Sequence, residues 1–172
     1  MLDHNGHIPA FIDLTEAKKS DISAAKNMDF PKGSILVFDR GYNDYNWFLK
    51  IGKNGCFFVT RLKKNAKYRV VERRKVNKKQ GVTSDQVIEV KTKSKVLRLR
   101  RIGYRDKETG KHYEFLTNNF RLVAKTIADI YKERWKIETF FKEIKQNLKI
   151  KSFVGTSENA VLAQVYVALT VY

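Results

Sequence analysis

The chain has 172 residues, of which 42% are hydrophobic, so it can bury the core of an ordinary domain and lacks the composition of a disordered protein. Its net charge of +17, from 35 Lys and Arg against 18 Asp and Glu, indicates a polyanionic partner, with nucleic acid ahead of a membrane. One cysteine excludes an intramolecular disulfide, and the absence of a signal-peptide pattern or a long apolar run predicts a cytoplasmic protein without a membrane partner.

The first third of the chain alternates between strand and helix patterns. Residues 7–17 predict a strand and residues 19–30 a short helix. The apolar run 35–38 is typical of a strand buried on both faces, and Asp39 follows it. Residues 43–55 predict another helix and residues 56–62 a second buried strand. This order indicates an α/β core that begins with residues 1–61.

Residues 62–117 have a different pattern. Four segments, 68–75, 85–92, 95–106 and 111–119, contain alternating apolar and charged residues, as half-exposed antiparallel strands do. From Arg61 to Arg101 there are 16 Lys or Arg and 3 Asp or Glu, a net charge of +13. We therefore predict a basic β insertion, with the charged stretch 73–85 as a mobile loop.

The remaining residues, 118–172, predict helices that complete the core. At 100° per residue, four polar residues of the helix 130–150 share one arc about 60° wide. They are Tyr131, Arg134, Glu138 and Lys145, and the apolar residues of the helix lie beside this arc. We expect these four side chains along the rim of the buried face, where one carboxylate and several phosphate-binding groups can meet the same ligand.

Two carboxylates are candidates for metal-dependent chemistry. Ligands of open α/β sheets bind beyond the carboxyl ends of the strands, where Asp39 is expected. Asp39 and Glu138 could share Mg²⁺ ions, which prefer oxygen ligands and assist phosphodiester chemistry in pairs. Two structural alternatives remain open: Asp39 as the first residue of a turn, and Glu138 as an ion-pair partner of Arg134 or Lys142.

The string Tyr131-x2-Arg134-x3-Glu138-x6-Lys145 resembles the motif of the transposases named for insertion sequence four, within the DDE superfamily. The segments "ILVFDRGYNDYNWF" and "GCFFVTRLKKNAKY" are similar to the surroundings of that family's second catalytic aspartate. The resemblance implies an RNase H-like core with an inserted antiparallel β subdomain. It also implies a bacterial enzyme that uses Mg²⁺ or Mn²⁺ to cleave transposon ends and join them to target DNA, with a homodimer in the synaptic complex.

The resemblance also assigns roles by position. Asp39 and Glu138 would be catalytic metal ligands, and Tyr131, Arg134 and Lys145 would bind DNA phosphates. Further DNA contacts are expected from basic residues next to Asp39 and after the second buried strand, namely Arg40, Arg61, Lys63 and Lys64.

The family's first catalytic aspartate lies on the first core strand, for which this chain has no good candidate. Asp3 falls in a predicted turn and Asp13 in the middle of a predicted strand. We therefore expect a transposase fragment, cut at both ends and inactive alone. The alternatives are a catalytically dead DNA-binding remnant, an inhibitor of a full-length transposase, and a basic RNA-binding protein, although the last does not explain the spacing of the helix motif.

Overall fold

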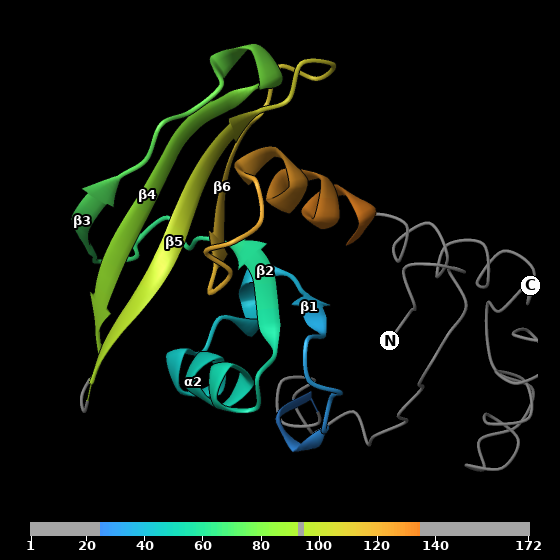
Figure 1. Ribbon diagram of the computed structural model, residues 1–172, viewed down its shortest axis with the longest axis vertical. Coiled ribbons are helices and arrows are strands. Elements are labelled where there is room, and N and C mark those ends of the chain that lie inside the picture. Colours follow the sequence, from blue (N-terminus) through green and yellow to red (C-terminus); the bar gives the residue numbers. More distant parts are fainter. Residues whose placement is uncertain (1–24, 93–94, 135–172) are drawn as a thin grey trace, which may run out of the picture. The chain divides into compact units, whose positions relative to one another are not determined.

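The computed structural model describes residues 25–92 and 95–134 (Figure 1). The predicted strand 7–17, most of the helix 19–30, and both Glu138 and Lys145 lie outside these ranges. In chain order, the elements are β1 (Ile35–Val37), η1 (Arg40–Tyr42), α2 (Tyr45–Lys53), β2 (Phe57–Arg61), β3 (Arg69–Arg73), η2 (Lys78–Gln80), β4 (Val82–Lys91), β5 (Val96–Arg105) and β6 (His112–Thr117). A further helix runs from residue 124 through residue 134, the last one described.

The six strands form one mixed sheet with the order β1-β2-β6-β5-β4-β3. β1 and β2 are parallel, as expected for strands joined through a helix, whereas every other neighbouring pair is antiparallel. The predicted mixture of α and β structure is confirmed. β6 pairs directly with β2, so the strands of residues 62–117 continue the same sheet. The division into an RNase H-like core and an inserted subdomain stays a prediction.

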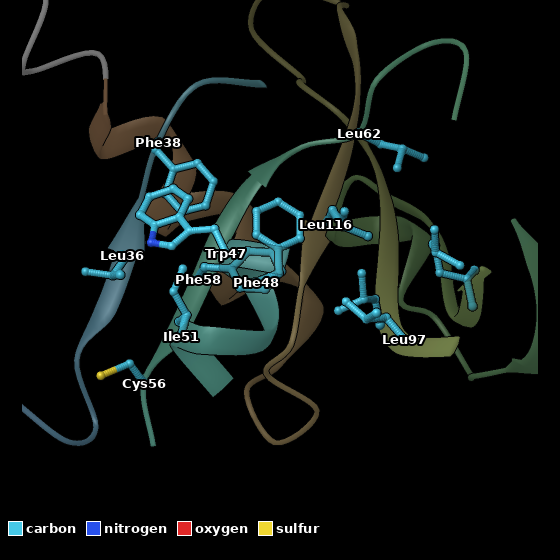
Figure 2. Packing of buried hydrophobic residues seen from close by; sticks show 13 residues of the cluster. Leu36, Phe38, Trp47, Phe48, Ile51, Cys56, Phe58, Leu62, Leu97 and Leu116 are labelled. Atoms are coloured by element: carbon cyan, nitrogen blue, oxygen red, sulfur yellow. The ribbon is translucent and has the colours of Figure 1, made fainter. Parts of the chain in front are cut away.

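Apolar side chains pack on both faces of the sheet. Because successive strand residues point to opposite faces, Phe58 and Val59 belong to different clusters. On one face, α2 covers an aromatic group in which the rings of Phe48 and Phe58 stack with centroids 4.2 Å apart (Figure 2). On the other face, the helix that begins at residue 124 packs Ile127 against the cluster of Val59 and Phe115. The sheet is therefore held between two helices where β2 lies.

Local signals in the sequence fix the ends of α2. Asp44 caps its first turn, since Oδ1 accepts hydrogen bonds from the backbone N–H groups of Asn46 and Trp47 at 2.8 and 3.1 Å. Shortly after the helix, Gly55 adopts a φ of +72°, which favours glycine. The chain then reverses into β2 and lays it parallel to β1.

The charged stretch 73–85 is not the single loop that its composition predicted. Residues 78–80 form η2, and β4 already begins at Val82. The turn between them has Gly81 at a φ of +84°, where an added Cβ would lie 2.6 Å from the carbonyl oxygen of Arg105. The prediction was wrong at its carboxyl end because pairing with β5 decides the structure there, and a local pattern does not reveal that pairing.

No helix within residues 25–92 and 95–134 is long and apolar enough to cross a membrane.

Candidate functional site

Asp39 lies just beyond the carboxyl end of β1, as the sequence predicted. It also caps η1, because its Oδ1 accepts a hydrogen bond from the N–H of Gly41 at 3.1 Å. The side chain is 37% exposed, so a carboxylate held by a turn can still meet a ligand. Asp39 is therefore the first residue of a turn, as one of the two alternatives stated, and this position does not exclude a functional role.

Arg61 is the direct partner of Asp39. It ends β2, the parallel neighbour of β1, and parallel strands bring their carboxyl ends to the same edge of a sheet. Its Nη2 donates to Oδ2 of Asp39 at 2.9 Å. Its guanidinium carbon lies 5.9 Å from the ring centroid of Tyr131, within range of a cation–π contact. The structure thus brings together three of the predicted site residues, from three different elements.

Asn43 fastens this arrangement, and the sequence analysis missed it. Its Nδ2 donates to the carbonyl oxygen of Arg61 at 2.9 Å, and its Oδ1 accepts from Oγ1 of Thr60 at 2.9 Å. Its own carbonyl oxygen accepts a hydrogen bond from Nζ of Lys63 at 3.2 Å. The turn after Asp39 is therefore tied to the end of β2. The only signal in the sequence was the position of Asn43 within "FDRGYN", which does not identify a partner.

Tyr131 is not on the rim of its helix, and that part of the prediction was wrong. The ring is 1% exposed and packs against Phe115 with centroids 5.0 Å apart. The helix begins at residue 124, and its buried stripe consists of Ala124, Ile127, Ala128 and Tyr131, with the spacing of one helical face. Tyr131 is thus part of the stripe itself, and its predicted contact with DNA remains a prediction.

Lys132, the residue after Tyr131, forms an ion pair that the sequence analysis also missed. Its Nζ lies 2.5 Å from Oδ2 of Asp106, a side chain that is 1% exposed. The hydrogen bond from Lys132, together with those from the N–H groups of Thr109 and Glu108, lowers the pKa of Asp106 to about 2. The same contact raises the pKa of Lys132. The turn between β5 and β6 is therefore fastened to the helix next to Tyr131.

The other predicted residues are placed less fully. Arg40 and Lys64 are exposed, the first in η1 beside Asp39 and the second after β2. Residues 11–132 form one compact unit, and Arg134 belongs to another that includes the residues from Glu133 onward. Arg134 is therefore not placed relative to Asp39. Glu138 and Lys145 lie outside the described residues.

Asp39 fits a divalent metal ion as a single ligand. It offers hard oxygen donors at an exposed sheet edge, which suits Mg²⁺ or Mn²⁺. The neighbouring Asp44 does not fit: burial raises its pKa, but hydrogen bonds from Lys26 and from the first turn of α2 hold that pKa below its ordinary value. Within the described ranges, no three His, Cys, Asp or Glu side chains form a group that could hold a metal ion.

Comparison with known families concerns the chain as a whole. Residues 1–172 match the family model described as a transposase DDE domain. The chain belongs to the DDE transposase family. The resemblance drawn from the Tyr131 to Lys145 string is thereby confirmed, and Asp39 with Arg61 becomes a structural feature of a DDE transposase domain.

Three curated transposases are similar to this chain. One named transposase y4zB, from Sinorhizobium fredii, is 35% identical over 177 residues, covering 99% of this chain and 49% of the relative. Another, named for insertion sequence element IS5377 of Geobacillus stearothermophilus, is 32% identical and covers 80% of this chain and 37% of the relative. A third, named for element IS4SA of Synechocystis, is 28% identical, with 83% and 40% covered. The chain therefore spans about half or less of the length of these relatives.

Proposed function

We propose that this chain is part of a DNA transposase that cleaves transposon ends with Mg²⁺ or Mn²⁺ and joins them to target DNA. The observation that carries the proposal is the contact between Asp39 and Arg61 at the carboxyl edge of β1 and β2, beside Tyr131, in a member of the DDE transposase family. Because the chain spans about half or less of its relatives, we assign catalysis to the whole protein and DNA binding to this chain.

In this proposal, Asp39 and Glu138 would each supply one carboxylate to hold the metal ions. Such ions, when bound, would supply activation of the attacking hydroxyl and stabilisation of the leaving oxygen. Arg61 orients Asp39 from the neighbouring strand β2, and Asn43 ties the turn after Asp39 to the end of that strand. The guanidinium of Arg61, next to Asp39, would bind the negatively charged phosphodiester, a group that arginine binds well.

The basic character of the chain supports DNA as the partner. The +13 stretch from Arg61 to Arg101 forms most of β3, β4 and β5, and many of its cations are exposed. We assign DNA phosphate contacts to Arg40, which follows Asp39, to Lys63 and Lys64 after the end of β2, and to Tyr131, Arg134 and Lys145. A homodimer in the synaptic complex and a place in the bacterial cytoplasm belong to the same proposal.

Cleavage of DNA that carries the element's own ends tests this function. We expect Asp39→Asn, made in the whole transposase, to lower the rate of Mg²⁺-dependent cleavage at least about a hundredfold, since each tenfold loss corresponds to only 1.4 kcal/mol of transition-state stabilisation. Glu89→Gln is the matched control, because Glu89 pairs with Arg69 on the far part of the sheet. Cleavage by Asp39→Asn at the rate of the control variant would contradict the assignment.

A DNA-binding role without catalysis is the second candidate. The observation in its favour is that both oxygens of Asp39 already accept hydrogen bonds, from Gly41 and Arg61. DNA affinity of the 172-residue chain, measured with and without Mn²⁺, separates the two functions. The transposase proposal expects Mn²⁺ to strengthen DNA binding by the wild type and not by Asp39→Asn. A binding module without metal would show the same affinity under all conditions.

A further inference from the structure

A cavity of about 430 Å³ opens on the sheet and is lined by residues other than those around Asp39. It lies between the segment 74–80, strands β4 and β5, and the residues 120–125 that lead into the last described helix. Its lining contains none of Asp39, Arg61 and Tyr131. The residues that matter for its chemistry are Arg74, Lys75, Val76, Arg121, Val123 and Lys125.

The wall of this cavity contains a buried ion pair and no unpaired carboxylate. Arg100 is 2% exposed and binds Asp85 through two hydrogen bonds of 2.8 and 2.7 Å. It also donates to the carbonyl oxygens of Asn119 and Leu122, at 3.2 and 2.6 Å. Because Arg100 neutralises Asp85, an anion that enters the cavity meets no unpaired carboxylate there.

Four more cations line the cavity. Lys75 and Arg121 are exposed. Arg74 lies 3.5 Å from Glu72, and Lys125 lies 2.5 Å from Asp129 one helical turn later. Both cations are half-buried, but their carboxylate partners Glu72 and Asp129 are exposed. Ion pairs that reach solvent in this way are weak, so both cations can exchange a carboxylate for a phosphate at little cost. These four cations therefore concentrate positive charge at the cavity. Glu72 and Asp129 offset part of this charge, but neither of them lines the cavity.

Apolar side chains complete the lining. Val123 is 63% exposed, and the partly buried Val76 lines the same cavity. Cations beside apolar carbon match a nucleic-acid backbone, which alternates phosphates with sugars. The volume is that of a small-ligand site and exceeds what one inorganic anion needs.

The cavity is also close to the candidate active site along one element. Lys125 precedes Tyr131 by six residues of the same helix, which corresponds to about 9 Å along the helix axis. Since each DNA strand carries a phosphate about every 3.4 Å of duplex, that distance covers only a few nucleotides. We propose that this cavity is a second DNA-backbone site, which binds phosphates a few nucleotides from those held beside Arg61. The proposal rests on the proposed function, because it takes DNA as the ligand.

The salt dependence of DNA binding tests the site. The 172-residue chain would be titrated with a labelled 20-base-pair duplex of arbitrary sequence at several salt concentrations. The slope of log K against log salt is negative, and we expect the double variant Lys75→Ala/Arg121→Ala to reduce its magnitude by roughly 1.8, about 0.9 for each lost phosphate contact. The control, Lys32→Ala/Lys53→Ala, removes two exposed cations beside α2 and should keep the wild-type slope.

The outcomes separate the two proposals. A wild-type slope in Lys75→Ala/Arg121→Ala, or an equal loss in both double variants, would overturn the cavity as a DNA site and leave the transposase function standing. A wild-type chain that does not bind the duplex at any salt concentration would contradict the proposed function itself.

Alkylation of an introduced thiol locates the DNA without relying on affinity. The natural Cys56 is buried, with 2% of its surface exposed, so Val123→Cys supplies the reactive thiol. We expect duplex DNA to slow its reaction with iodoacetamide at least fivefold, and inorganic phosphate at the same phosphate concentration to slow it far less. Val96→Cys is the control, since Val96 is also exposed, at 54%, but does not line the cavity. The proposal would be overturned if duplex DNA slowed alkylation equally at positions 123 and 96, or did not slow it at position 123. It would also be overturned if inorganic phosphate slowed alkylation at position 123 as much as duplex DNA does.

Discussion

At the scale of single residues, a buried ion pair joins strands to the segment before the last described helix. Asp85 and Arg100 face each other from β4 and β5 with side chains only 6% and 3% exposed. Arg100 also satisfies two carbonyl oxygens, at Asn119 and Leu122, in a part of the chain without regular structure. Both the hairpin and this connection therefore depend on one guanidinium.

We expect Arg100→Met to destabilise the fold by about 3–5 kcal/mol, because it leaves the carboxylate of Asp85 buried without a partner. Unfolding in urea, followed by circular dichroism, measures the loss. Arg98→Met is the matched control: Arg98 is 64% exposed and lies 3.4 Å from Glu72, so its removal should cost about 1 kcal/mol or less. Similar losses of unfolding free energy in Arg100→Met and Arg98→Met would contradict the claim that burial makes the Asp85–Arg100 pair important for stability.

Asp39 illustrates how far a single residue can be understood from the sequence. The apolar run before it predicted the strand end, and the turn after it was one of the two possibilities considered. Its contact with Arg61, 22 residues later, was not predictable from either pattern. It exists because β1 and β2 are parallel neighbours whose ends meet.

At the scale of elements, the turn between β5 and β6 holds the helix that carries Tyr131. Asp106 accepts hydrogen bonds from the N–H groups of Glu108 and Thr109 through one oxygen and pairs with Lys132 through the other. The rings of Tyr104 and Phe115 lie on the same side of the sheet and pack in the cluster that contains Tyr131. The hairpin thus fixes both the position and the rotation of this helix.

This contact predicts a pH dependence of stability. The pKa of Asp106 is about 2 in the folded state and 3.8 in its unperturbed state, so the unfolded chain binds more protons between these values. The stabilisation is complete above about pH 5 and is lost as the pH falls toward 2. We expect the difference in urea midpoint between wild type and Asp106→Asn to be constant from about pH 6 to 5 and to shrink at lower pH.

The substitution Lys132→Met provides the control for this prediction. It removes the main cause of the lowered pKa while keeping the carboxylate, so the chain should lose most of the same pH dependence. A difference between wild type and Asp106→Asn that stays constant down to pH 3 would show that the ion pair does not contribute to stability in this way.

At the scale of the whole molecule, the sheet joins segments that the sequence suggested were separate. β6 pairs with β2 on one side and β5 on the other, through Thr117 with Val59 and with Arg100. Leu116 and Phe115 lie on opposite faces of β6 and are both fully buried, in clusters that include residues from outside 62–117. The basic strands therefore share their core with the α/β part.

We expect the isolated segment 62–117 not to fold, because it would expose Phe115 and Leu116 and leave β6 without its partner β2. Its amide NMR spectrum should show little dispersion. The compact unit 11–132 should instead give a dispersed spectrum and a single unfolding transition. A folded 62–117 segment would mean that the insertion is an independent subdomain after all.

The sequence by itself determined the elements and the family. Local periodicity predicted β1, β2 and most of β3 to β6, and the spacing from Tyr131 to Lys145 identified a DDE transposase. The prediction that Tyr131 lies on the rim of its helix failed. The helix was taken to begin at residue 130, and this omits Ala124 and Ile127, which define the buried stripe. Hydrophobic periodicity acts over a few residues and can be read along the chain.

Only the tertiary structure decided which side chains meet. The partners of Asp39, Asp85 and Asp106 lie 22, 15 and 26 residues away in the sequence, and each pair depends on strand order or helix packing. The basic cavity has the same origin, since its lining comes from segments around residues 74–85 and 120–125 that only the sheet brings together. Charges carry no periodic signal of their partners, so the contacts of the site are set by the packing of the apolar core.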